Sequence, residues 1–145
     1  MRLLRGHAAL RRSLSAQLQS EHGLTVNDYE ALLLLSRAED GQLRRVDLAE
    51  RLQLTPSGVT RLLDGLEKLG LVCKGNCTSD ARVTYAVITD PGRKNLEHAS
   101  CGHTSLIRTL FEERFSQQEL RQLSELVGRL PGAESAGGEE CATGS

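Results

Sequence analysis

The chain has 145 residues, the length of one domain, and its 39% hydrophobic and 26% charged residues exclude a wholly disordered protein. With 3% aromatic residues and no tryptophan, the core must consist of leucine, valine and alanine, which favours packed helices over a large β-sandwich. The net charge is −1, but it is unevenly distributed: residues 44–94 contain nine basic and six acidic residues, whereas residues 95–145 contain four and eight. The basic excess of the central segment favours a polyanion as its partner.

Two helices are predicted before residue 41. Apolar residues at helical spacing indicate a first helix over residues 2–20, which ends at Gly23. Thr25 and Asp28 have the spacing of a capping box, in which each side chain bonds the backbone N–H of the other residue. The second helix therefore begins after Thr25, is apolar almost all round and ends before Gly41.

A short third helix is predicted over residues 45–52, followed by a turn at residues 53–54. Thr55 caps the fourth helix, residues 56–69, and Pro56 occupies its first position, where the missing N–H costs nothing. The apolar side of this helix has Val59, Leu62, Leu63, Leu66 and Leu69. The opposite side has Ser57, Thr60, Arg61, Asp64 and Lys68. One side is expected to pack and the other to face outward.

After Gly70 the pattern changes to alternation, which indicates a short strand at residues 71–73, a polar loop at 74–82 and a second strand at 83–88. A long helix begins at Pro91. A capping box of Ser116 and Glu119 then starts a last helix that ends near Leu130, and a disordered tail is expected over residues 131–145.

This order of elements is mainly α with a small β-wing, and it predicts a winged helix-turn-helix with helical extensions at both ends. The major groove of B-DNA admits one α-helix, and a helix N-terminus offers amide donors and partial positive charge to phosphates. Arg61 has the reach and the forked donors to bond guanine O6 and N7, and Arg82 at the loop can reach an adjacent minor groove.

The residues also resemble the MarR family (multiple antibiotic resistance regulators) of bacterial transcription factors. The resemblance spans about residues 20–130. Its motifs are Gly23-Leu24-Thr25, Asp47-Leu48-Ala49-Glu50-Arg51-Leu52, Leu54 to Glu67, Gly70-Leu71-Val72, the wing residues Asp80-Ala81-Arg82, and Thr89-Asp90-Pro91-Gly92-Arg93. Ile88 stands where the family has leucine.

The resemblance implies a single domain over residues 1–130, with dimerisation helices at about 2–20 and 92–130 and a DNA-binding lobe at about 25–90. It implies a homodimer that binds pseudo-palindromic operator DNA, acts as a repressor and is released by a small molecule. We expect DNA contacts from the start of the fourth helix, its outer side and the wing. The residues are Thr55, Pro56, Ser57, Thr60, Arg61, Asp64, Lys68, Lys74, Asp80 and Arg82. Asp80 is expected to orient Arg82.

Two histidines have positions that suit an effector pocket. His103 lies on the leucine seam of the long helix and His7 occupies a similar position on the first helix. Family ligands bind between the dimerisation helices and the DNA-binding lobe, so the resemblance implies a pocket flanked by both residues, with an aromatic carboxylate or phenol as ligand. The alternative is that both are hydrogen-bonded interface histidines.

No enzymatic constellation emerges: the sequence lacks a paired-carboxylate, nucleophile-base or phosphate-loop pattern, and we expect no cofactor. Cys73 and Cys77 have a C-x3-C spacing without a second ligand pair, so no metal site is expected. A thiol- or metal-responsive regulator, with Cys73, Cys77 or Cys101 as sensor, remains an alternative, as does a winged-helix protein-interaction module that does not bind DNA.

We expect a cytoplasmic protein without a membrane partner. The longest apolar run, Ala31 to Leu35, is far shorter than the roughly 18 residues that a membrane span needs, and arginines interrupt the N-terminal leucines where a signal peptide would be apolar. In that reducing compartment the four cysteines, including Cys141, are expected to be thiols.

Overall fold

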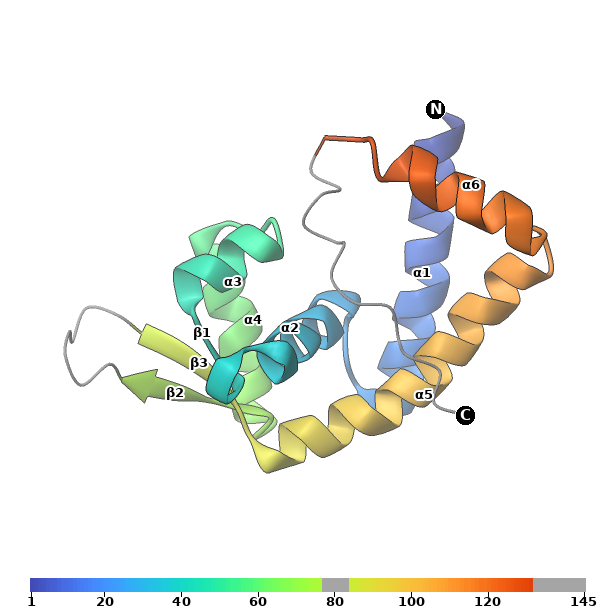
Figure 1. Cartoon of the computed structure of the whole chain (residues 1–145). Coiled ribbons are helices and arrows are strands. Elements are labelled where there is room, and N and C mark those ends of the chain that lie inside the picture. The colour runs from blue at the N-terminus through green and yellow to red at the C-terminus, as the bar shows by residue number, and fades with distance from the viewer. Residues whose placement is uncertain (77–83, 132–145) are drawn as a thin grey trace. The chain divides into compact units, whose positions relative to one another are not determined.

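The computed structural model describes residues 1–76 and 84–131 (Figure 1). Its elements are, in order, α1 (Arg2–His22), α2 (Val26–Arg37), the 3-10 turn η1 (Glu39–Gly41), β1 (Gln42–Arg44), α3 (Arg45–Arg51), α4 (Pro56–Lys68), β2 (Val72–Asn76), β3 (Thr84–Ile88), α5 (Asp90–Glu112) and α6 (Gln117–Val127). The chain divides into two compact units at residues 106 and 107. The prediction of a mainly helical winged helix-turn-helix is confirmed, and the first unit contains it.

The first two helices have the boundaries that their capping residues dictate. Gly23 ends α1 with φ of 66°, a left-handed conformation that glycine adopts without a side-chain clash. The capping box of Thr25 and Asp28 is present at the start of α2. Helix α2 is the centre of the first unit, because its Leu32 and Leu35 are fully buried together with Leu18 of α1.

The helix-turn-helix consists of α3, a tight turn and α4. Gln53 in the turn has φ of 53°, and the Leu54 N–H donates to the Ala49 carbonyl at 2.9 Å. Thr55 then caps α4 and Pro56 stands in its first turn, as predicted.

One residue of the predicted apolar stripe of α4 does not pack. Val59, Leu63 and Leu66 are buried and Leu62 is partly buried against them, but Leu69 is 60% exposed. Leu69 is the C-cap residue of α4, and at 100° per residue it lies at the edge of the stripe rather than at its centre.

The sheet differs from the predicted two-stranded wing in having three antiparallel strands in the order β1-β3-β2. Strand β1 pairs Gln42 with Val87, and β2 pairs Val72 with Ile88. Two predicted boundaries are also wrong, because β2 begins after Leu71 and continues through Lys74 into the predicted loop. The residues that extend β2 pair with β3, Lys74 with Ala86, Gly75 with Tyr85 and Asn76 with Thr84, and this pairing satisfies their backbone groups. In Figure 1 the β2–β3 hairpin projects from the lobe on the side opposite α1.

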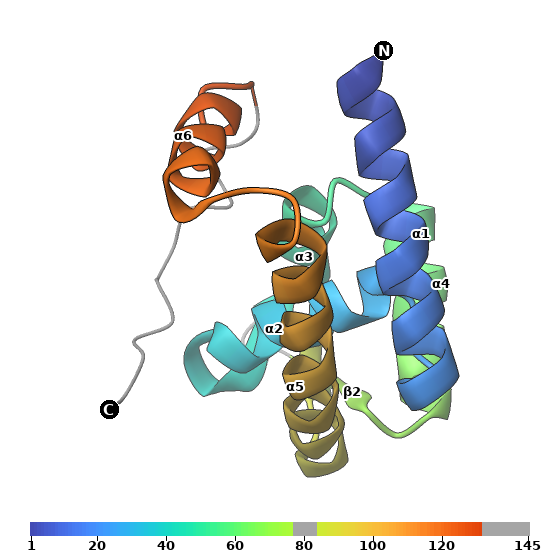
Figure 2. The same ribbon diagram turned by 90° about the vertical axis from the view of Figure 1, so that its right-hand side faces the viewer.

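Helix α5 starts in close contact with the turn before β2. The Thr89 hydroxyl donates to the Gly70 carbonyl at 2.6 Å and accepts the Gly92 N–H at 3.1 Å. A Cβ at Gly92 would lie 2.1 Å from the Leu71 carbonyl oxygen, so only glycine fits there. Further along, α5 crosses α2 (Figure 2), where the rings of His103 and Tyr29 lie 4.5 Å apart.

In the second unit, the predicted capping box begins α6. The Ser116 backbone N–H donates to Glu119 at 2.8 Å, and this bond holds the pKa of Glu119 below its ordinary value. The helix ends at Val127, before Gly128, a poor helix former, rather than near Leu130. Of the predicted tail, residues 132–145 lie outside the described residues.

Within the ranges 1–76 and 84–131, no helix is long and apolar enough to cross a membrane.

The contact at Gly92 yields a stability prediction with a matched control. Gly92→Ala should lower the free energy of unfolding by about 1–3 kcal/mol, because the added methyl overlaps the Leu71 carbonyl. Gly65→Ala, in the interior of α4 with nothing within 4 Å of its Cβ position, should raise it by about 0.5–1 kcal/mol. Urea denaturation followed by circular dichroism measures both values. Equal stability of the two variants would contradict the packing described here.

Candidate nucleic-acid interface

The outer side of α4 is exposed as predicted. Ser57, Thr60, Arg61 and Lys68 are exposed and Asp64 is partly buried, and Thr55 and Pro56 at the helix start are exposed too. Because the opposite side is fixed in the core, these side chains form a defined surface, which we call the α4 polar face. The α4 polar face consists of Thr55, Pro56, Ser57, Thr60, Arg61, Asp64 and Lys68.

At the start of the α4 polar face the backbone is capped. The Thr55 hydroxyl accepts the Gly58 N–H at 3.1 Å and lies 3.2 Å from the Ser57 hydroxyl. The first turn of α4 contains no acidic residue, so nothing there offsets the partial positive charge of the helix N-terminus. This end of the helix therefore favours an anion.

Thr60 is held by a residue that the sequence did not single out. Its hydroxyl donates to the Pro56 carbonyl at 2.9 Å and accepts from the Arg45 guanidinium at 2.8 Å. Arg45 is the first residue of α3, so this bond joins the two helices of the motif. No local spacing reveals a tertiary contact across 15 positions, and only the folded turn brings the two residues together.

Arg61 lies in different surroundings from Thr60. It lines a shallow groove of about 320 Å³ with Asn27 and Asp28 at the start of α2 and with Gly58 of its own helix. The chain's described part holds no ion-pair partner for Arg61, so its guanidinium remains available to a ligand. Its neighbour Thr60 borders a second groove, between α3 and α4.

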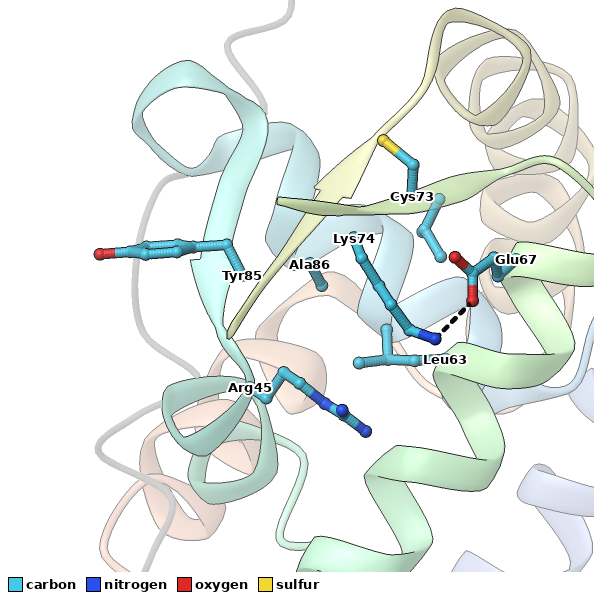
Figure 3. Close-up of a pocket in the computed structure, with 8 residues that line it drawn as sticks. Arg45, Leu63, Glu67, Cys73, Lys74, Tyr85 and Ala86 are labelled. Carbon is cyan, nitrogen blue, oxygen red and sulfur yellow. Dashed lines mark ion pairs between the residues drawn. The ribbon is translucent and has the colours of Figure 1, made fainter. Parts of the chain in front are cut away.

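Lys74, at the base of the wing, is paired with α4. Its Nζ lies 3.1 Å from a Glu67 carboxylate oxygen beside a very small pocket (Figure 3). Figure 3 shows the Cys73 sulfur directed away from this pair, as neighbouring residues of a strand require. Lys74 is therefore partly neutralised within the lobe, and it does not approach the Cys73 thiol.

Three residues singled out in the wing lie outside the described residues: Asp80 and Arg82, for which DNA contact is predicted, and Cys77. Among the described cysteines, Cys73 and Cys101 are exposed. Within that part of the chain, no group of three histidine, cysteine, aspartate or glutamate side chains is placed to hold a metal ion.

The two histidines predicted for an effector pocket differ in burial. His103 is 7% exposed, packs on Tyr29, and its Nδ1 is buried with no hydrogen-bond partner among the described residues. Burial lowers the pKa of its imidazole. His7 lies on an exposed position of α1. The pocket that the two residues flank stays a prediction.

Known proteins are similar to this chain in sequence and in fold. A model of the MarR family matches residues 22–82. AbsC, a MarR family transcriptional regulator from Streptomyces coelicolor, is 31% identical and superposes with a TM-score of 0.79, over 86% of this chain and 83% of that one. The chain belongs to the MarR family.

Two further proteins are similar to this chain. Sco3205 from Streptomyces coelicolor, whose crystal structure is of a complex with DNA, is 28% identical and superposes with a TM-score of 0.82, over 86% of this chain and 78% of that one. YetL from Bacillus subtilis, an HTH-type transcriptional repressor, is 33% identical over 108 residues, which are 74% of this chain and 64% of YetL. The chain thus spans less than two thirds of the length of YetL.

The buried histidine gives a pH prediction. Because burial lowers the pKa of His103 below its ordinary 6.5, the unfolded state binds the proton more readily than the folded state. Stability should therefore be unaffected above pH 6.5 and fall as the pH drops from 6.5 toward the lowered pKa of the folded state. Urea denaturation at a series of pH values measures this loss.

His103→Gln should reduce the loss on acidification, and His98→Gln, at an exposed position of the same helix, should keep it. Superimposable pH profiles for the wild type and His103→Gln would show that His103 is not the group responsible.

Proposed function

We propose that this protein is a homodimeric DNA-binding transcription regulator, a repressor that binds pseudo-palindromic operator DNA and is released by a small-molecule effector. The observation that carries the proposal is the α4 polar face, a capped helix start with exposed polar side chains and the available guanidinium of Arg61. A helix presented in this way fits the major groove, so α4 is the recognition helix. The DNA complex of the related Sco3205 supports DNA as the partner of this protein.

The test is retardation of a fragment that carries the protein's own promoter, repeated with competitor DNA and across a range of salt concentrations. Sequence-selective binding that survives competitor supports the regulator. Binding that is absent, or that any DNA abolishes, favours a winged-helix protein-interaction module, the alternative that would leave the α4 polar face for a protein.

Arg61→Ala should weaken binding to the selected DNA by about 1–3 kcal/mol, because a bidentate contact to guanine is lost. Stability should not change, because Arg61 is exposed on the side of α4 away from the core. Arg108→Ala, which removes an exposed arginine outside the lobe, is the matched control and should bind like wild type. Unchanged affinity in a folded Arg61→Ala protein would remove Arg61 from the reading surface.

Homodimerisation is supported by apolar side chains left exposed on terminal helices. Leu3 and Leu4 of α1 are 61% and 66% exposed, and Leu126 of α6 is 58% exposed. A two-fold partner that covers such residues would bury apolar surface and place two recognition helices on one side of the duplex, about 10 base pairs apart.

Sedimentation equilibrium should therefore give the mass of a dimer at micromolar concentration. Leu126→Glu should shift the equilibrium toward monomer, since it places charge on that apolar surface. Val46→Glu on α3, at an exposed apolar position outside the predicted dimerisation helices, adds the same charge as a control and should leave the dimer intact. A stable monomer at micromolar concentration for the wild type would contradict the dimer.

Effector control is the last part of the proposal. A buried Nδ1 without a partner on His103 is a group that a ligand hydroxyl or carboxylate can satisfy, and Tyr29 beside it supplies an aromatic wall. We propose an aromatic carboxylate or phenol as ligand, bound near His103 and on the side of α1 that carries His7. Release follows only where the ligand binds the DNA-incompetent state more tightly.

A further inference from the structure

The hydroxyl of Thr60 has little hydrogen-bonding capacity left for a base. A threonine hydroxyl has one proton to donate and two lone pairs. The proton goes to the Pro56 carbonyl at 2.9 Å, and one lone pair accepts from Arg45 at 2.8 Å. Guanine offers only acceptors in the major groove, so Thr60 has no proton with which to recognise guanine.

The groove beside Thr60 is apolar. It has a volume of about 260 Å³ and is lined by Arg45, Val46, Ala49, Pro56, Val59 and Thr60. Val46, at the start of α3, is 66% exposed and lines this groove with an apolar side chain. An amino group of adenine or cytosine would lose its hydrogen bonds to water in this groove and would find at most one acceptor, the remaining lone pair of the Thr60 hydroxyl. A methyl group makes no hydrogen bonds to water, so its burial carries no such cost.

We propose that Thr60 is a specificity-determining residue that reads thymine through methyl-to-methyl contact, with Arg45 and Pro56 holding its hydroxyl away from the bases and Val46 forming the far wall of the methyl site. This inference rests on the proposed function, because it places operator DNA on α4. It identifies the chemical group that the α4 polar face recognises beside the guanine predicted for Arg61.

The experiment isolates the thymine methyl group. The full chain first selects duplexes from a random double-stranded library, and each thymidine of the selected half-site is then replaced by deoxyuridine, which lacks only the 5-methyl group. At one position of the half-site the replacement should weaken binding about fourfold, the factor that one buried methyl group contributes. Replacement in both half-sites should weaken it about 15-fold, and the other thymidines serve as controls.

Two variants of Thr60 assign the effect to its methyl group. Thr60→Ser keeps the hydroxyl and loses the methyl, so it should bind the thymidine and deoxyuridine duplexes equally. Thr60→Val keeps a methyl and loses the hydroxyl, so it should retain the wild-type ratio between the two duplexes. Unfolding midpoints of both variants verify that the lobe remains folded.

The outcomes separate this inference from the proposed function. A wild-type chain that selects no duplex sequence overturns the proposed function and this inference with it. Selective binding that is insensitive to deoxyuridine at every half-site position overturns the methyl contact alone. So does a ratio that persists in Thr60→Ser or disappears in Thr60→Val, because the hydroxyl would then carry the contact.

Discussion

Burial of one side of α4 is the constraint on which the rest of the interface depends. Val59 and Leu66 are 1% exposed and Leu63 is 6% exposed, so α4 cannot rotate about its axis without bringing them into water. Each such side chain contributes about 1.5–3 kcal/mol when buried, a large part of the roughly 5–15 kcal/mol that stabilises a small domain. The hydrophobic core therefore decides which polar side chains face outward.

Ion pairs near α4 then reduce the positive charge on the surface of the lobe. Arg44 donates two hydrogen bonds of 2.7 Å to Asp47. Hydrogen bonding to Arg44 holds the pKa of the Asp47 carboxyl below its ordinary value. Lys74 is similarly engaged by Glu67. Such exposed pairs contribute little stability, but they remove positive charge from the surface that a polyanion would meet. Arg61 on α4 has no such partner among the described residues, so its guanidinium stays exposed and unpaired at that surface.

Much of the fold was predictable because its signals are local. The helix starts at Thr25, Thr55 and Ser116 follow from hydroxyl side chains that bond backbone N–H groups three residues away, and these caps need no tertiary partner. The exposed side of α4 likewise follows from a period of 3.6 residues.

Features that depend on partners distant in sequence were missed. Three residues of β1 are too few to show an alternating pattern, and their pairing is decided by the free edge of β3. Leu69 fits the stripe by spacing, but it lies at the edge of the stripe and Leu71 takes the buried position instead. The bond between Arg45 and Thr60 needs the folded turn, so the sequence indicates an exposed threonine without indicating which of its atoms is available.

The close approach of the Gly92 and Leu71 backbones, at the start of α5, has a mechanical consequence. With room for no more than a hydrogen atom between the two backbones, and with Thr89 bonded across to Gly70, this contact contains no free volume in which one side can slide past the other. A rotation of the first turn of α5 would therefore have to carry the turn after α4 with it or break this contact.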